Sequence, residues 1–174
     1  CLIHCTQMTP EETIALARSG AVAGLCPITE SSLGDGIFDG VRWMDEGGAF
    51  AIGSDSNIRI SLSEELRTLD YSQRLRDGSR AALASGVKST GRRMFDGMLQ
   101  GGARAAARDT GRIEAGAWAD MLALDTNSEH LWGREGDTTL DAWIFAGDDS
   151  LVTDVWSAGR HMVQHGKHVQ RATI

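Results

Sequence analysis

The sequence predicts an α/β fold in which three parallel strands are covered by helices and a β-rich module follows. Short apolar runs alternate with helical segments over residues 1–108. This order of strand, helix, strand, helix, strand, helix favours parallel pairing, because each crossover returns the chain to the same edge of the sheet. After residue 111 the pattern changes to alternating apolar and polar positions between glycines, which is typical of antiparallel strands.

The first strand and helix occupy residues 1–20. The sequence CLIHC is predicted to be a short buried strand that ends at His4. In the segment TPEETIALARSG, Thr9 is a favoured N-cap residue and Glu12 stands where it completes a capping box. A proline in the first turn and a glycine at the end set the limits of this helix.

The next two strands follow the same plan. The run AVAGLCP, at 21–27, predicts a second buried strand, and the segment 28–36, rich in Gly, Ser and Asp, is predicted to be a loop. Residues 37–48 indicate a short helix that stops at two glycines. The sequence AFAIGSD, at 49–55, predicts a third strand that places Asp55 at the end of the sheet.

Two longer helices and a β-rich module complete the chain. Leucines at helical spacing predict a helix over 61–76, and inward methionines and alanines predict another over 90–108. Composition then shifts, so we expect a domain boundary at about residue 110 that separates 1–110 from 111–174. A helix-like segment, TLDAWIFAG, lies between the alternating strands of the second part.

Composition excludes several classes of protein. The formal charge of −7 disfavours nucleic acid as a partner, because phosphate binding needs clustered Lys and Arg. No apolar run reaches the roughly 20 residues that span a bilayer, so no membrane partner is expected. With 41% apolar and 24% charged residues, the chain is typical of a soluble globular protein, and we expect it in the cytoplasm.

The cysteines and the first residue indicate a piece of a cytoplasmic protein. Three cysteines at irregular spacing match neither a disulfide framework nor a CxxC metal knuckle. Cys1, Cys5 and Cys26 are therefore predicted to be small core residues in a reducing compartment. The chain opens inside a predicted strand, with neither a starting Met nor a signal peptide, so we expect the native polypeptide to continue upstream of Cys1.

The candidate chemistry stands at the ends of predicted strands. Three strand–helix units are too few to close a barrel, but they suit the last part of one. In a parallel α/β barrel, reactive groups project from the C-terminal ends of the strands, so His4 and Asp55 are expected to face one pocket. There they would act as metal ligand, general base or orienting pair. The alternatives are a core histidine bonded to a backbone carbonyl and an aspartate that caps a turn or the next helix.

Two other groups of residues have alternative interpretations. Glu30 is either a substrate contact in a long loop or a solvated loop acid. His161, His165 and His168 lie close together in RHMVQHGKH, either as a metal site or, as alternation favours, on a solvated strand face.

Several segments resemble the C-terminal half of metal-dependent amidohydrolases of the deaminase branch. They are CLIHCTQMTPEE, ARSGAVAGLCPITESSLGDGIF, FAIGSDSN and EELRTLDYSQRLR. The closing GRIEAGAWADMLALD and DVWSAGRHMVQHGKH resemble the small β-sandwich of that superfamily. The resemblance covers essentially the whole chain. It implies the last three strand–helix units of a (β/α)8 TIM barrel, followed by a β-sandwich module.

The resemblance also implies roles for the strand-end residues. Asp55 would bind the catalytic metal, one divalent ion expected to be Zn²⁺, and take a proton from the attacking water. His4 would bind and polarise the substrate. The family's remaining metal ligands are histidines with no counterpart here, and the chain contains no His-x-His. They are expected upstream of Cys1, so this chain alone would be inactive.

The expected reaction is hydrolytic deamination of a C=N carbon. Within the family, the sequence is most similar to deiminases that convert N-formimino-L-glutamate to N-formyl-L-glutamate and ammonia in histidine degradation. The expected partners are this small molecule, the upstream polypeptide and a second copy in a homodimer. One alternative is another amidohydrolase, such as a guanine or triazine deaminase. The other is a non-catalytic fragment or interaction subunit.

Overall fold

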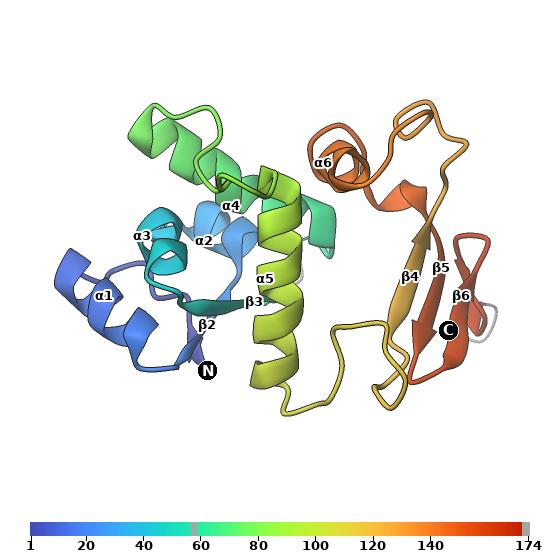
Figure 1. Ribbon diagram of the computed structural model, residues 1–174, viewed down its shortest axis with the longest axis horizontal. Helices are drawn as coiled ribbons and strands as arrows, with labels where there is room; N and C mark the ends of the chain where they lie inside the picture. Colours follow the sequence, from blue (N-terminus) through green and yellow to red (C-terminus); the bar gives the residue numbers. More distant parts are fainter. Residues whose placement is uncertain (57–58, 172–174) are drawn as a thin grey trace.

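Two sheets organise the chain, which is described here by a computed structural model for residues 1–56 and 59–171 (Figure 1). The first is parallel, with the order β1-β2-β3, and the second is antiparallel, with the order β4-β5-β6-β7. The strands are β1 (Leu2–Ile3), β2 (Val22–Leu25), β3 (Ala49–Ile52), β4 (Met121–Leu124), β5 (Val152–Ser157), β6 (Arg160–Gln164) and β7 (Lys167–His168).

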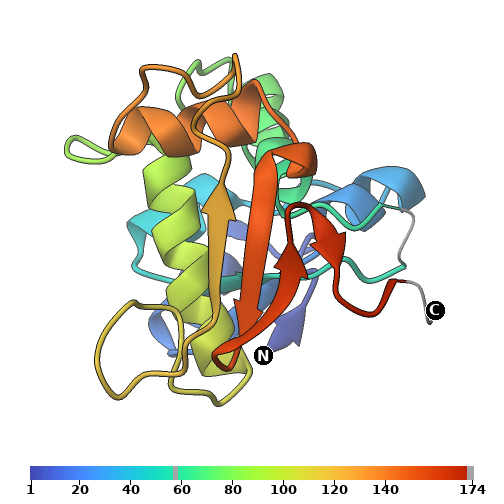
Figure 2. The same ribbon diagram turned by 90° about the vertical axis from the view of Figure 1, so that its right-hand side faces the viewer.

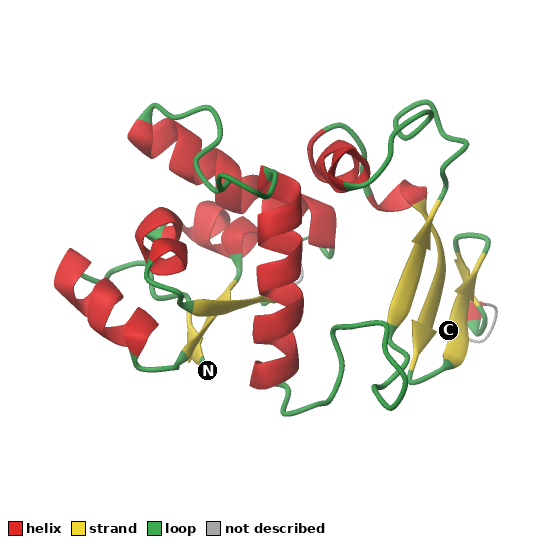
Figure 3. Cartoon of the chain, viewed as in Figure 1, coloured by secondary structure: helices red, strands yellow, loops and turns green. Residues whose placement is uncertain are grey.

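The helices lie mainly around the parallel sheet (Figure 3). They are α1 (Pro10–Arg18), α2 (Pro27–Leu33), α3 (Gly40–Asp45), α4 (Leu62–Asp77), α5 (Thr90–Ala105) and α6 (Asp137–Phe145), with a 3-10 turn at Asp149–Leu151. The predicted capping box of α1 is present, because Thr9 accepts the Glu12 N–H and Glu12 accepts the Thr9 N–H. None of the described helices has both the length and the apolar composition needed to cross a bilayer.

The parallel pairing predicted from the alternation is confirmed. Ala23 of β2 pairs with Leu2 of β1 and with Phe50 of β3. The helix α5 packs directly on β3, where a Cβ at Gly101 would lie only 1.8 Å from the Phe50 carbonyl oxygen. Only glycine allows this approach of helix and strand. The buried core joins Leu25 and Phe50 of the sheet to side chains of α3, α4 and α5, namely Trp43, Leu66, Leu69, Met94 and Met98.

The strand β1 is less buried than its sequence predicts. Leu2 and Ile3 are 41% and 58% exposed, because β1 forms the edge of the sheet among the described residues. Cys1 is exposed and Cys5 half-buried, so of the three cysteines only Cys26 is a buried core residue as predicted. Apolar side chains at an edge strand have no neighbour to cover them.

The prediction of a loop over 28–36 is wrong for most of that segment. Residues Pro27–Leu33 form α2, with the proline at the first turn and Gly34 in the left-handed conformation that ends the helix. The serines favoured a loop reading, but the Gly-Asp-Gly run that breaks the helix begins only at residue 34. Buried contacts of Thr29 and Glu30 hold the helix in place.

The second part of the chain contains one four-stranded antiparallel sheet among the described residues. In Figure 2 this sheet faces the viewer, and α5 lies behind it. Helix α6 leaves the sheet and packs on α4 and α5, where Trp143 is buried and its ring lies 6.0 Å from that of Phe95. The boundary near residue 110 stays a prediction, and residues 172–174 of the predicted module lie outside the described part.

Candidate active site

The ends of the three parallel strands bring together ligand-type side chains. His4 follows β1, Cys26 follows β2 and Asp55 lies shortly after β3. One nitrogen, sulfur or oxygen atom of each lies within 4.8 Å of the corresponding atoms of the other two. His4 Nε2 is 3.7 Å from Asp55 Oδ2. The two residues expected to share a pocket therefore lie side by side, although they come from opposite edges of the sheet.

Unusual backbone geometry marks both residues. His4 has φ +66°, Cys5 φ +55° and Asp55 φ +45°, which is the left-handed region that side chains other than glycine rarely adopt. The sheet anchors these turns, since His4 N–H donates to the Gly24 carbonyl at 2.8 Å. Strained residues of this kind concentrate at functional sites. The left-handed backbone of His4 and Asp55 is thus consistent with a functional role for their side chains.

Asp55 does not cap the following helix. The N-cap of α4 is Ser61, whose side chain accepts the Glu64 N–H. Asp55 is 43% exposed, and its ion-pair partner among the described residues is His4. The helix-capping alternative for this aspartate is therefore wrong, and the turn-capping alternative stays open.

Glu30 lies behind His4, on the side away from Asp55. Its Oε1 is 3.2 Å from His4 Nδ1 and accepts the Cys26 N–H at 2.8 Å. The side chain is only 5% exposed, and burial raises the pKa of its carboxyl. The interpretation of Glu30 as a solvated loop acid is therefore wrong. The structure does not test its predicted contact with substrate.

The thiol of Cys26 is the third member of the group. Burial raises the pKa of this thiol to about 11, and the nearby carboxyls of Glu30, Asp55 and Glu65 add to the effect. Without a cation beside it, the sulfur is therefore a neutral thiol at pH 7. Thiolate is the form that binds metals. The carboxylate of Asp55 and the imidazole of His4 are the better ligands of the three.

A second buried carboxyl escaped the sequence analysis. Glu65 of α4 is 2% exposed, and its Oε2 accepts the Ile28 N–H at the start of α2. Its Oε1 has no hydrogen-bond partner within the described residues, and burial raises the pKa of the carboxyl to about 7. A signal was present in the sequence. Glu65 lies three residues after Leu62 and four before Leu69, which places it on the apolar face of its helix.

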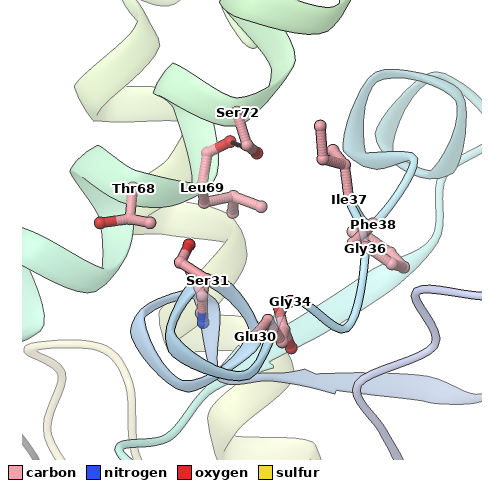
Figure 4. Close-up of a pocket in the computed structure, with 10 residues that line it drawn as sticks. Glu30, Ser31, Gly34, Gly36, Ile37, Phe38, Thr68, Leu69 and Ser72 are labelled. Atoms are coloured by element: carbon pink, nitrogen blue, oxygen red, sulfur yellow. Dashed lines mark hydrogen bonds between the residues drawn. The ribbon is translucent and has the colours of Figure 1, made fainter.

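Two cavities flank the Glu30–His4 pair. One, of about 660 Å³, opens beside His4 against α1, with Thr6, Gln7 and Glu12 among its lining residues. The other, of about 260 Å³, lies between α2, the segment 34–38 and α4 (Figure 4). Figure 4 shows Ser31 of α2 facing Thr68 and Leu69 of α4 across it. Only the first cavity is lined by His4, so it is the one nearer the candidate chemistry.

The three C-terminal histidines do not converge. His161 Nε2 lies 2.7 Å from Asp154 Oδ1, and its ring stacks on Trp156 with ring centres 4.5 Å apart. Among the described residues, no metal-type group includes His161, His165 or His168. These contacts support the interpretation of a strand face and not of a metal site.

Comparison with known proteins gives the wider setting of this geometry. A formimidoylglutamate deiminase of Pseudomonas aeruginosa is 48% identical over 169 residues, which are 97% of this chain and 37% of that protein. The crystal structure of an amidohydrolase from Brucella melitensis matches with a TM-score of 0.91 and 46% identity, over 99% of this chain and 38% of that one.

A zinc-containing structure also matches. An adenosine deaminase from Xanthomonas campestris, solved with bound zinc, has a TM-score of 0.84 and 25% identity, over 98% of this chain and 38% of that chain. The chain thus spans somewhat more than a third of the length of these relatives. A model of the amidohydrolase family matches residues 1–162, and the chain therefore belongs to the amidohydrolase family.

Proposed function

We propose that this chain is the C-terminal part of an enzyme that hydrolyses N-formimino-L-glutamate to N-formyl-L-glutamate and ammonia. The observation that carries the proposal is the pairing of His4 and Asp55 at the ends of β1 and β3, with their side chains 3.7 Å apart. The relative named for this substrate, with 48% identity along nearly the whole chain, supports the choice of reaction.

The proposed complete fold is a (β/α)8 barrel with a β-sandwich. The exposed Leu2 and Ile3 on the open edge of β1 are where a preceding barrel strand would pair. A second sheet from elsewhere in the polypeptide would cover the antiparallel sheet and complete the sandwich. The homodimer and the cytoplasmic location expected from the sequence remain part of this proposal.

The site fits one divalent cation, with Zn²⁺ the proposed ion. Asp55 offers a half-exposed carboxylate that no Lys or Arg pairs within the described residues, which suits a cation. Zinc takes three or four protein ligands, so upstream residues would supply the others. The bound zinc of the Xanthomonas relative supports this choice. When bound, such an ion would lower the pKa of a coordinated water to about 7 and so supply the nucleophile.

Asp55 and His4 have different roles in the proposed reaction. Asp55 would hold the cation through its carboxylate, which would also accept a proton from the attacking water. When both ring nitrogens carry a hydrogen, His4 donates a hydrogen bond from Nε2 to the substrate group on which charge develops. The water oxygen bonds to the formimino carbon and the bond to the terminal nitrogen breaks. Both water protons finish on that nitrogen, which leaves as ammonia, and the carbon becomes the formyl group.

A substrate panel tests this proposal on the full-length protein. Ammonia release is measured with N-formimino-L-glutamate, guanine and 5-methylthioadenosine, and metal content is measured on the same preparation. We expect turnover of N-formimino-L-glutamate and about one bound zinc per site. Turnover of a purine with none of N-formimino-L-glutamate would reassign the substrate, and full metal content without any turnover would support a non-catalytic role.

A further inference from the structure

We propose that Glu30 is a positioning residue for His4. Its buried carboxylate holds Nδ1 of the imidazole and thereby turns Nε2 towards Asp55. This inference rests on the proposed function, because Glu30 would act on the reaction only through His4.

The hydrogen bonds around Glu30 define what it does to the ring. Its Oε1 accepts the backbone N–H of Cys26 at 2.8 Å and lies 3.2 Å from His4 Nδ1. Since this oxygen serves as an acceptor for the backbone, Nδ1 carries the hydrogen that it also receives. Nε2 is then the nitrogen left to face Asp55 at 3.7 Å. One oxygen thus sets both the tautomer and the direction of the imidazole.

Glu30 is more buried than the His4 ring that it contacts. His4 is one-third exposed in its side chain and stands in a strained turn, so the sheet alone does not hold the ring. Glu30 is 5% exposed and sits in the first turn of α2, which Pro27 starts. The backbone N–H of Cys26 fixes Oε1 on that rigid element. A ring oriented by a fixed carboxylate keeps its reacting nitrogen in place.

A bond to the backbone alone does not explain the position of Glu30. The Cys26 N–H needs only one acceptor, yet the same oxygen also lies 3.2 Å from His4 Nδ1. Glu65 of α4 also accepts a backbone N–H at the start of α2, so it can be compared directly with Glu30. It is 2% exposed and accepts the Ile28 N–H, but among the described residues it has no hydrogen bond to His4. Glu65 is therefore the matched control for Glu30.

The test is a double-mutant cycle in the full-length protein. Glu30→Leu, Glu30→Gln and Glu65→Leu are each made alone and with His4→Asn. The rate of ammonia release, KM, metal content and melting temperature are measured for every variant. N-formimino-L-glutamate is the first substrate and 5-methylthioadenosine the second.

A positioning role has a distinctive pattern. Glu30→Leu should lower kcat about 10–100-fold, the usual loss when a hydrogen-bond partner of a site histidine is removed, with KM and metal content nearly unchanged. Glu30→Gln should recover most of the rate, because its carbonyl oxygen accepts the same two N–H groups. In the His4→Asn background, Glu30→Leu should cost less than about twofold, since coupled residues are not additive. Glu65→Leu should not couple to His4.

Other outcomes separate the two proposals. Equal losses from Glu30→Leu in both backgrounds, or a loss from Glu65→Leu that couples as strongly to His4, overturn the positioning role and leave the reaction intact. Turnover of 5-methylthioadenosine alone overturns the proposed substrate, and the cycle is then read with that substrate. Absence of turnover with both substrates overturns both proposals. Should Glu30→Leu fail to fold, Glu30→Asp replaces it. The shorter side chain withdraws the carboxylate from His4 while keeping the charge, and the same non-additivity with His4→Asn is expected.

Discussion

Two pairs of histidine and aspartate lie in different sheets of this molecule, and the closer pair is not the candidate site. His161 Nε2 and Asp154 Oδ1 are 2.7 Å apart on adjacent antiparallel strands, whereas His4 Nε2 and Asp55 Oδ2 are 3.7 Å apart. The first pair faces across a hairpin, and the histidine ring is also stacked on Trp156. Both contacts hold the histidine ring within the antiparallel sheet.

The second pair is built differently. His4 and Asp55 follow strands at opposite edges of a parallel sheet, both with left-handed backbone, and Glu30 already occupies Nδ1 of the histidine. The carboxylate of Asp55 remains open on one side. Position at the carboxyl ends of parallel strands, and unused bonding capacity, therefore identify a site better than a short distance does.

The largest expected effect concerns the completeness of the strand-end site. The isolated chain 1–174 should neither retain Zn²⁺ nor release ammonia from N-formimino-L-glutamate. Of the three candidate ligands, burial keeps the Cys26 thiol neutral, which leaves His4 and Asp55 where zinc needs three or four ligands. Equilibrium dialysis and an ammonia assay check this, with the full-length protein as the positive control. Measurable turnover by the isolated chain would contradict the incomplete site.

The two aspartates give the next contrast. Asp55→Asn in the full-length protein should lower turnover about 10²–10⁴-fold, because it removes a base and weakens the metal site. The matched variant Asp154→Asn should stay within about twofold, since among the described residues it bonds to His161 of the same antiparallel sheet. The rate and the metal content are measured together. A near-normal rate in Asp55→Asn with full metal occupancy would remove the distinction between the pairs.

Glu65 extends the contrast to stability. Its pKa is raised from 4.5 to about 7 in the folded state, so its contribution to stability is complete below pH 4.5 and is lost as pH rises through about 7. Glu65→Gln has no ionisable group at this position and so avoids the cost of ionising a buried carboxyl. The variant should therefore gain on the wild type as pH rises from 4.5 to 7, by up to about 3 kcal/mol.

The measurement for Glu65 is thermal unfolding of both full-length proteins at several pH values. Glu64→Gln serves as the control, because Glu64 is a neighbour whose side chain is 28% exposed and forms an ion pair with Arg59. A difference between Glu65→Gln and the wild type that does not change with pH would show that Glu65 is not desolvated in the folded protein.

The smallest effect is expected in the antiparallel sheet. His161→Ala removes a half-exposed ring that stacks on Trp156 and bonds to Asp154, and should cost about 1 kcal/mol of stability with turnover unchanged. Denaturant unfolding and the ammonia assay check the two parts. A loss of bound metal in this variant would revive the metal interpretation of the C-terminal histidines.

Local sequence determined much of this structure. The capping box of Thr9 and Glu12, the apolar runs of the strands and the glycine stops act over a few neighbouring residues, so their outcome can be predicted from sequence alone. The same local rules place His4 and Asp55 at strand ends. Parallel pairing then follows from the alternation of strands and helices, and brings these ends to one side of the sheet.

Only the tertiary structure decided what surrounds those residues. The segment after Pro27 is a helix because Glu65, far along the chain, accepts the Ile28 N–H and because Thr29 and Glu30 are buried. The role of Glu30 depends on His4, another distant residue. Hydrogen bonds between distant segments leave no local pattern, because they depend on which surfaces meet when the helices pack on the sheet.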